Sequence, residues 1–250
     1  MNAAVLTDGN TETSPRLQAR MAGFLYLIVI VAGLFAEIFV REALTVSGDA
    51  AATARNILAH ELRFRLGFAA ELIAGACNIP LAVIFYNLFR VVNRSLAWAV
   101  VFFTLVGTAI GGVVLLSHFA PLILLKGGGY LSVFKPEQLQ AGAYMSLRLQ
   151  SIGFAIALVF FGFYCLALGT LIFRSTFFPR IIGVLLAIEG AGYLINSFLL
   201  FLAPGLQARI FPYFMATGIG EVALCLWLFV MGVNVQRWKE QAGVAGEWRS

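Results

Sequence analysis

Six long apolar runs constrain the fold of this 250-residue chain more than any other feature. Each run approaches or exceeds the roughly 20 residues that an α-helix needs to cross about 30 Å of hydrocarbon at 1.5 Å per residue. The runs are too long and too continuous for barrel strands, which alternate over about ten residues. Because backbone groups inside a bilayer are satisfied only in helices or closed barrels, the pattern predicts six transmembrane helices. They cover residues 21–40, 64–89, 96–125, 149–173, 177–202 and 211–234.

The composition agrees with a membrane protein. The chain is 61% hydrophobic and 12% charged, whereas a soluble domain is about half apolar and about a quarter charged. We therefore predict an all-α, polytopic membrane protein with one six-helix transmembrane domain over residues 16–238. A polar N-terminal tail (1–15) and a C-terminal tail (239–250) flank this domain. The first 20 residues hold no apolar core, so we do not expect them to be a cleavable signal peptide.

Loop character predicts the orientation. The loops around residues 90–94 and 174–180 are short, basic and free of acidic residues, which is typical of cytoplasmic turns. The connections 41–63 and 126–147 are longer and mix acidic with basic residues. Both termini are therefore expected in the cytoplasm. The net charge of +5 then matches the anionic lipid headgroups of that face, and no nucleic-acid partner is needed to explain it.

The two longer outer connections also carry helix signals. Ser47 or Asp49 can cap a helix that leads into the second span. Pro136 suits the first position of a helix that continues into the fourth span. The glycines at 127–129 supply the break before it.

Ionisable and amide side chains occur inside the apolar runs, where a charge is costly and normally faces the bundle interior or a wet cavity. Counted from the expected helix starts, most of them lie in the outer half of the bilayer or at its centre. Glu189 and Asn196 are seven residues apart, so they share one helix face. Arg148 is the expected cation among these groups. The predicted site is an outer-half polar pocket lined by Glu37, Glu71, His118, Arg148, Glu189, Asn196 and Glu221.

Three interpretations of these residues stay open. The acids and Arg148 can pair as structural contacts that fix helix register, they can form a ligand, ion or proton site, or they can form a metal or catalytic site. Four carboxylates against one arginine favour a cationic guest. The sequence holds only two histidines, too few for a multi-histidine metal centre, so we predict no metal and no cofactor. Nucleophile-elbow, P-loop and dinucleotide-binding motifs are absent, which argues against an enzyme.

A weak internal similarity joins GTAIGGVVLL (107–116) to ATGIGEVALC (216–225). Three helices followed by three more of opposite orientation would form an inverted repeat, and such repeats often frame a site in mid-membrane. Gly107 and Gly111 have the spacing typical of close helix packing. Small-residue faces of this kind also allow the chain to form oligomers.

Four stretches together resemble a bacterial integral membrane family named as a domain of unknown function, number 4386 in that series. They are RMAGFLYLIVIVAGLFAE (20–37), GDAAATARNILAHELRFRLG (48–67), LGTLIFRSTFFPRIIGVLLAIEGAGYLINSF (168–198) and GEVALCLWLFVMGV (220–233). The resemblance extends over about residues 16 to 238, and FRSTFFPRIIGVLLAIEGAGYL is its most specific part. It implies a six-helix protein of the bacterial cytoplasmic membrane. It implies no activity and no catalytic or binding residues.

The leading functional hypothesis is therefore an integral membrane protein that binds or transports a small polar, amphipathic or cationic ligand, or protons. Membrane lipids are its expected surroundings. One alternative is a membrane-embedded enzyme acting on a lipid or isoprenoid, with a Glu and His118 as acid and base. The other is a non-catalytic structural or sensor subunit.

Overall fold

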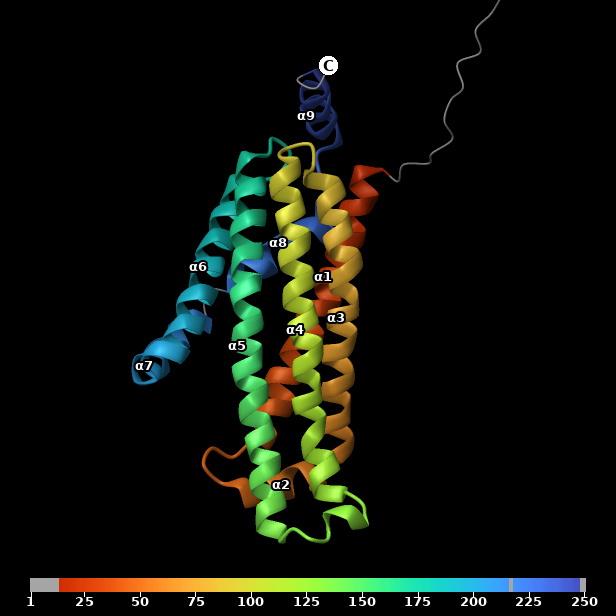
Figure 1. Cartoon of the computed structure of the whole chain (residues 1–250). Coiled ribbons are helices and arrows are strands. Elements are labelled where there is room, and N and C mark those ends of the chain that lie inside the picture. Colours follow the sequence, from red (N-terminus) through yellow and green to blue (C-terminus); the bar gives the residue numbers. More distant parts are fainter. Residues whose placement is uncertain (1–13, 216–217, 248–250) are drawn as a thin grey trace, which may run out of the picture.

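The computed structural model describes residues 14–215 and 218–247, and these residues form helices and connecting turns without a strand (Figure 1). Most of the predicted N-terminal tail lies outside these ranges. The elements are α1 (Pro15–Leu34), the π-helical segment η1 (Phe35–Glu42), α2 (Ala50–Ala59), α3 (Glu61–Phe89), α4 (Arg94–Lys126), the short 3-10 helix η2 (Gly129–Leu131), α5 (Pro136–Arg174), α6 (Arg180–Leu202), α7 (Pro204–Met215), α8 (Ile219–Val230) and α9 (Val235–Glu247).

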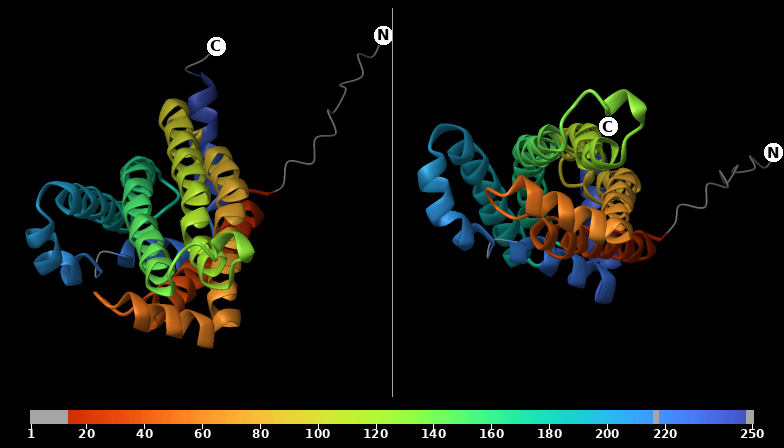
Figure 2. Two further views of the ribbon diagram at one scale, coloured as in Figure 1. Left: turned by 60° about the horizontal axis from the view of Figure 1, so that its bottom comes forward. Right: turned by 90° about the horizontal axis from the view of Figure 1, so that it is seen from below.

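Within residues 14–215 and 218–247, five helices are long and apolar enough to cross a membrane: α1 with η1, α3, α4, α5 and α6. The helices α3, α4 and α5 run side by side, and α1 packs along α3 (Figures 1 and 2). Large apolar side chains cover the outside of the bundle; Val113 and Leu116 of α4, for example, are 67% and 72% exposed. An outer surface of this kind suits hydrocarbon as the solvent. The chain is a multi-pass, all-helical membrane protein.

The last predicted span, residues 211–234, is not one straight helix. Residues 211–215 are the end of α7, and the part described from residue 218 onward contains α8, which has 12 residues and is about 18 Å long, shorter than the hydrocarbon core. The chain then turns by 102° into α9. Gly232 in this turn has φ +68°, a conformation that favours glycine. The described residues thus hold five candidate spans, or six if the bent pair α8 and α9 counts as one. Residues 239–247, predicted as a tail, continue α9.

The bundle has two ends, named here by their elements. At the N-terminal end, drawn at the top of Figure 1, α1 begins and the loops 90–93 and 175–179 and helix α9 gather. At the α2 end, helix α2 lies across the bundle and contacts α4 and α5. The Asp49 side chain caps α2 by accepting from the Ala52 N–H at 2.8 Å, and α5 begins at Pro136 and runs unbroken to Arg174. Both local predictions are confirmed.

Two apolar clusters form the core. The larger one joins α1, α3, α4, α5, α6 and α8 in the half nearer the N-terminal end, with Phe85, Leu168 and Leu224 among its fully buried members. The smaller one lies beneath α2 and includes Ile57 and Leu122. Polar side chains sit beside each of these clusters, so the polar groups fall into two separate places.

Candidate functional site

The first polar group, the tyrosine–carboxyl cluster, consists of Glu189, Glu221, Tyr26, Tyr193 and Cys165. Tyr26 donates its hydroxyl to Glu221 Oε1 at 2.8 Å. The Tyr193 hydroxyl lies 3.0 Å from Glu189 Oε1 and 3.2 Å from Glu221 Oε2. The Cys165 thiol lies 3.9 Å from Glu221 Oε1. Four helices, α1, α5, α6 and α8, therefore converge on two carboxyl groups.

The start of α8 explains how the two glutamates meet. Gly218, the residue before this helix, gives no side-chain cap, and the first N–H groups of a helix need outside partners. Glu189 on α6 supplies one, because its Oε2 accepts from the Glu221 backbone N–H at 2.8 Å. A Cβ at Gly220 would come within 2.6 Å of the same Oε2 atom. A glycine at 220 therefore lets α8 approach the Glu189 carboxyl group closely.

A seam of four glycines brings α5 and α6 into backbone contact next to this cluster. A Cβ at Gly190 would lie 2.6 Å from the Gly162 carbonyl oxygen, and a Cβ at Gly183 would lie 2.5 Å from that of Gly169. Small residues at such crossings let helices in membranes approach closely. A Cβ at Gly190, the residue after Glu189, would also lie 3.0 Å from Cys165 Cβ.

Charge in the tyrosine–carboxyl cluster is not balanced by a basic side chain. Glu189 is 0% exposed, and it accepts hydrogen bonds from the Tyr193 hydroxyl and from the Glu221 backbone N–H. Among the residues that the structure describes, no Lys, Arg or His side chain contacts Glu189 or Glu221. Two full negative charges there would be very costly in a membrane interior. The arrangement therefore suits one bound proton or another small cation.

Counting the protons available for hydrogen bonds also indicates one bound proton in this cluster. A tyrosine hydroxyl has one proton to donate, so Tyr193 donates to only one of its two carboxyl neighbours at a time. If that neighbour is Glu189, then a proton on Glu221 Oε2 can be donated to the Tyr193 oxygen. The three groups then form a continuous chain that carries a single extra proton.

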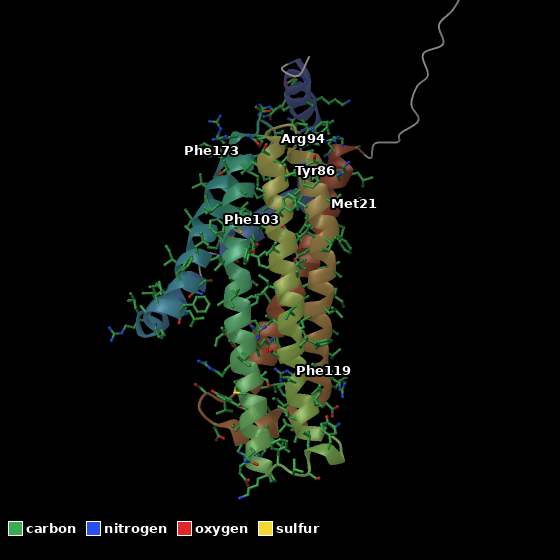
Figure 3. All side chains as sticks on the ribbon, in the orientation of Figure 1. Met21, Tyr86, Arg94, Phe103, Phe119 and Phe173 are labelled. Atoms are coloured by element: carbon green, nitrogen blue, oxygen red, sulfur yellow. The ribbon has the colours of Figure 1, made fainter. Side chains whose placement is uncertain are left out.

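The second polar group, the arginine–histidine cluster, consists of Arg41, Glu37, Glu71, His118 and Gln150. Arg41 pairs with Glu71 of α3 and with Glu37, whose Oε2 lies 2.6 Å from Arg41 Nη1. His118 of α4 is followed by Phe119, which Figure 3 places in the half of the bundle nearer α2. Unlike the first cluster, this one contains its own cation.

His118 and Gln150 are both 1% exposed and hydrogen-bond to each other. His118 Nε2 lies 3.2 Å from the Phe64 carbonyl oxygen, which only accepts, so the proton belongs on Nε2. Nδ1 then accepts from Gln150 Nε2 at 3.0 Å. Glu71 Oε2 is 3.4 Å from His118 Nδ1 and also 3.4 Å from Gln150 Nε2. Both ring nitrogens of His118 therefore have a hydrogen-bond partner.

The structure separates the residues that the sequence predicts as one pocket. Gln150 and Cys165, one in each cluster, are fifteen residues apart on α5, about 22 Å along the helix. Glu37, Glu71 and His118 belong to the arginine–histidine cluster, whereas Glu189 and Glu221 meet in the half nearer the N-terminal end. The described side chains therefore form two separate polar groups, in place of the one outer-half group that the sequence predicts.

Two further predicted site residues lie elsewhere. Asn196 accepts a hydrogen bond from Gln207 Nε2 of α7 at 2.9 Å, so it contributes to the α6–α7 contact and not to the tyrosine–carboxyl cluster. Arg148, the expected cation, is exposed. Arg41 takes that role in its place.

Sequence reasoning missed the partners of the acids. Arg41 lies one residue beyond the first apolar run and four after Glu37, the spacing of a helical ion pair. Gln150 lies at the second position of the fourth run. Tyr26 and Tyr193 read as ordinary aromatic residues of a membrane helix, and only the fold brings their hydroxyls to the carboxyl groups. No set of three or more His, Cys, Asp or Glu side chains is placed to hold a metal ion within the described residues.

Comparison of the chain with known proteins identifies its family but no activity. An uncharacterized protein of Archaeoglobus fulgidus is 31% identical over 74 residues, which are 30% of this chain and 43% of that protein. The chain thus matches less than half the length of this relative. No solved structure matches the chain. A family model described as "Domain of unknown function (DUF4386)" matches residues 21–232, most of the chain, and the protein therefore belongs to this family.

Proposed function

We propose that the protein binds a small cationic guest, in the first place a proton, between Glu189 and Glu221, and that it carries this guest across the membrane. One observation carries the proposal: two carboxyl groups share the Tyr193 hydroxyl inside the bundle, and no basic side chain of the described residues contacts them. Carboxyl groups inside a membrane commonly serve proton and ion pathways.

The wider membrane topology is part of the same proposal. In this proposal the protein crosses a bacterial cytoplasmic membrane six times, with α8 and α9 together as the last span. Both termini then lie in the cytoplasm. An inverted repeat of the two halves stays a prediction.

Infrared spectroscopy of the full chain in lipid vesicles tests the proton. The carbonyl band of a protonated carboxylic acid is separate from the bands of ionised carboxylates. The wild-type protein should show this band at neutral pH, with an intensity of one group per molecule. The variants Glu189→Gln and Glu221→Gln should lose it, whereas Glu137→Gln, an exposed residue of α5, should keep it.

Vesicles with an internal pH dye test the transport step. With a potassium diffusion potential as the driving force, the wild type should acidify the lumen faster than empty vesicles, and Glu189→Gln should not. If the band is missing from the wild type, the proton site is wrong. If both Gln variants unfold in mild detergent, Glu189 and Glu221 are structural contacts.

The arginine–histidine cluster supports a second proposal, a structural role. Its charged groups are paired with one another, as expected for contacts that fix helix register. The alternative of a membrane enzyme has less support there. Glu71 Oε2 lies 3.4 Å from His118 Nδ1, yet the His118 side chain is only 2% exposed, so a lipid substrate has no access to it.

A further inference from the structure

An open cavity of about 820 Å³ lies at the N-terminal end, far from both polar clusters, where the loop between α5 and α6 meets α9. Arg180, the first residue of α6, and Arg237 of α9 both line it, together with Thr176 and Gln241. The Gln241 side-chain oxygen accepts from the Thr176 N–H at 3.0 Å and its hydroxyl at 3.1 Å. These bonds tie α9 to the loop and give the cavity a fixed wall.

The two arginines keep their charge available to a ligand. Arg237 Nη1 donates to the Thr176 carbonyl oxygen at 3.4 Å, and Arg180 Cζ lies 5.7 Å from the centre of the Phe173 ring. Within the described ranges, neither forms an ion pair with a carboxylate. Glu240 also lines the cavity, so its lining holds two positive side chains and one negative one. The cavity is therefore electropositive.

The first turn of α6 adds hydrogen-bond donors. Pro179 precedes this 23-residue helix and offers no side-chain cap. Arg180 lines the cavity, and its backbone N–H group therefore has no partner within the helix. Free N–H groups and the helix dipole both favour an anion at this place. Donors with this geometry, together with arginine, are the usual way in which proteins bind a phosphate group.

The surface next to the cavity carries exposed apolar side chains. Ile181 is 62% exposed and Phe173 is 48% exposed, so apolar surface begins directly beside Arg180. Figure 3 shows Phe173 and Arg94 at this end of the bundle. A lipid whose acyl chains lie along α6 would bring its phosphate to the level of Arg180 and Arg237.

We propose that this cavity binds the phosphate of an anionic phospholipid headgroup, held by Arg180, Arg237 and the first N–H group of α6. Charge complementarity and the adjoining apolar face favour a lipid over a free anion, because a free anion gains nothing from Ile181 or Phe173. This site is independent of proton binding at Glu189 and Glu221.

Native mass spectrometry of the full chain in detergent, titrated with phosphatidylglycerol, tests the site. At about 1 kcal/mol for each basic residue near a membrane surface, the double variant Arg180→Gln, Arg237→Gln should bind this lipid roughly 30-fold more weakly than the wild type. The matched control Arg55→Gln, Arg148→Gln removes the same charge from exposed residues nearer the α2 end, and it should bind as the wild type does. Phosphatidylcholine should bind weakly to all three proteins.

Three results would overturn the proposal. The double variant can bind phosphatidylglycerol like the wild type, the control can lose as much affinity as the double variant, or millimolar inorganic phosphate can displace the lipid completely. The last result would make the cavity a site for free phosphate. If the double variant does not fold, the single variants Arg180→Gln and Arg237→Gln replace it, each with an expected loss of roughly fivefold.

Discussion

Replacing Arg41 by Gln is expected to lower the free energy of unfolding by about 3 kcal/mol, because the change leaves the Glu71 carboxylate without its cation in a place that is mostly buried. The side chains of Arg41 and Glu71 are only 14% and 17% exposed. Reversible unfolding in mixed micelles, followed by circular dichroism, gives the value. The double variant Arg41→Gln, Glu71→Gln should recover much of the loss, since no unpaired charge then remains.

Arg148→Gln is the matched control for this experiment. The sequence favours Arg148 as the intramembrane cation, but the structure leaves it exposed, and changes at exposed residues usually alter stability by less than about 0.5 kcal/mol. A larger loss in Arg148→Gln than in Arg41→Gln would contradict the pairing described here. A double variant that is no more stable than Arg41→Gln would show that Glu71 does not depend on Arg41.

Gly183→Ala is expected to destabilise the protein by about 2 to 3 kcal/mol, since its new methyl group would overlap the backbone of α5. The Cβ atom would lie 2.5 Å from the Gly169 carbonyl oxygen and 2.8 Å from the Phe173 nitrogen. Backbone atoms cannot move aside as a flexible side chain can, so α5 and α6 must separate. The loss should appear as a lower melting temperature in mild detergent.

Gly111→Ala provides the comparison for this substitution. Nothing lies within 4 Å of a Cβ at Gly111, and alanine is the better helix former by about 1 kcal/mol. This variant should melt at or above the wild-type temperature. Equal losses in the two variants would mean that the α5–α6 seam does not determine stability.

The sequence predicts the long helices well, because a long apolar run in a bilayer can satisfy its backbone groups only as a helix or in a closed barrel. Five of the six runs correspond to helices that are long enough to span. The last run fails for a local reason. Its apolar character continues through Gly232, whose positive φ turns the chain, and composition does not distinguish a turning glycine from a packing glycine. The paired motif Gly107 and Gly111 shows the same ambiguity: a Cβ at Gly107 would lie 3.0 Å from the Phe161 ring, whereas Gly111 faces open space.

The polar residues were harder to predict because their partners are set by the fold. Periodicity correctly directs Glu189 inward, since it is 0% exposed, but it does not say which helix lies opposite. The distance between the two clusters follows from how the helices are aligned along the bundle. Counting from expected helix starts does not give this alignment, because α5 begins well outside the apolar run and α8 begins inside the bundle. Uncharged donors such as Tyr26 carry no signal in the sequence that separates them from other aromatic residues.

The hydrogen bond between Tyr26 and Glu221 joins residues that are 195 positions apart. During biosynthesis the first helix is inserted long before the ribosome has made α8. Until α8 is made, the Tyr26 hydroxyl cannot form its hydrogen bond with Glu221. Loop-closure entropy makes such distant contacts slow to form. Docking of α8 should therefore be a late step in assembly. In a chain truncated before α8, the surface that α8 normally covers would stay exposed and could be recognised by cellular quality control.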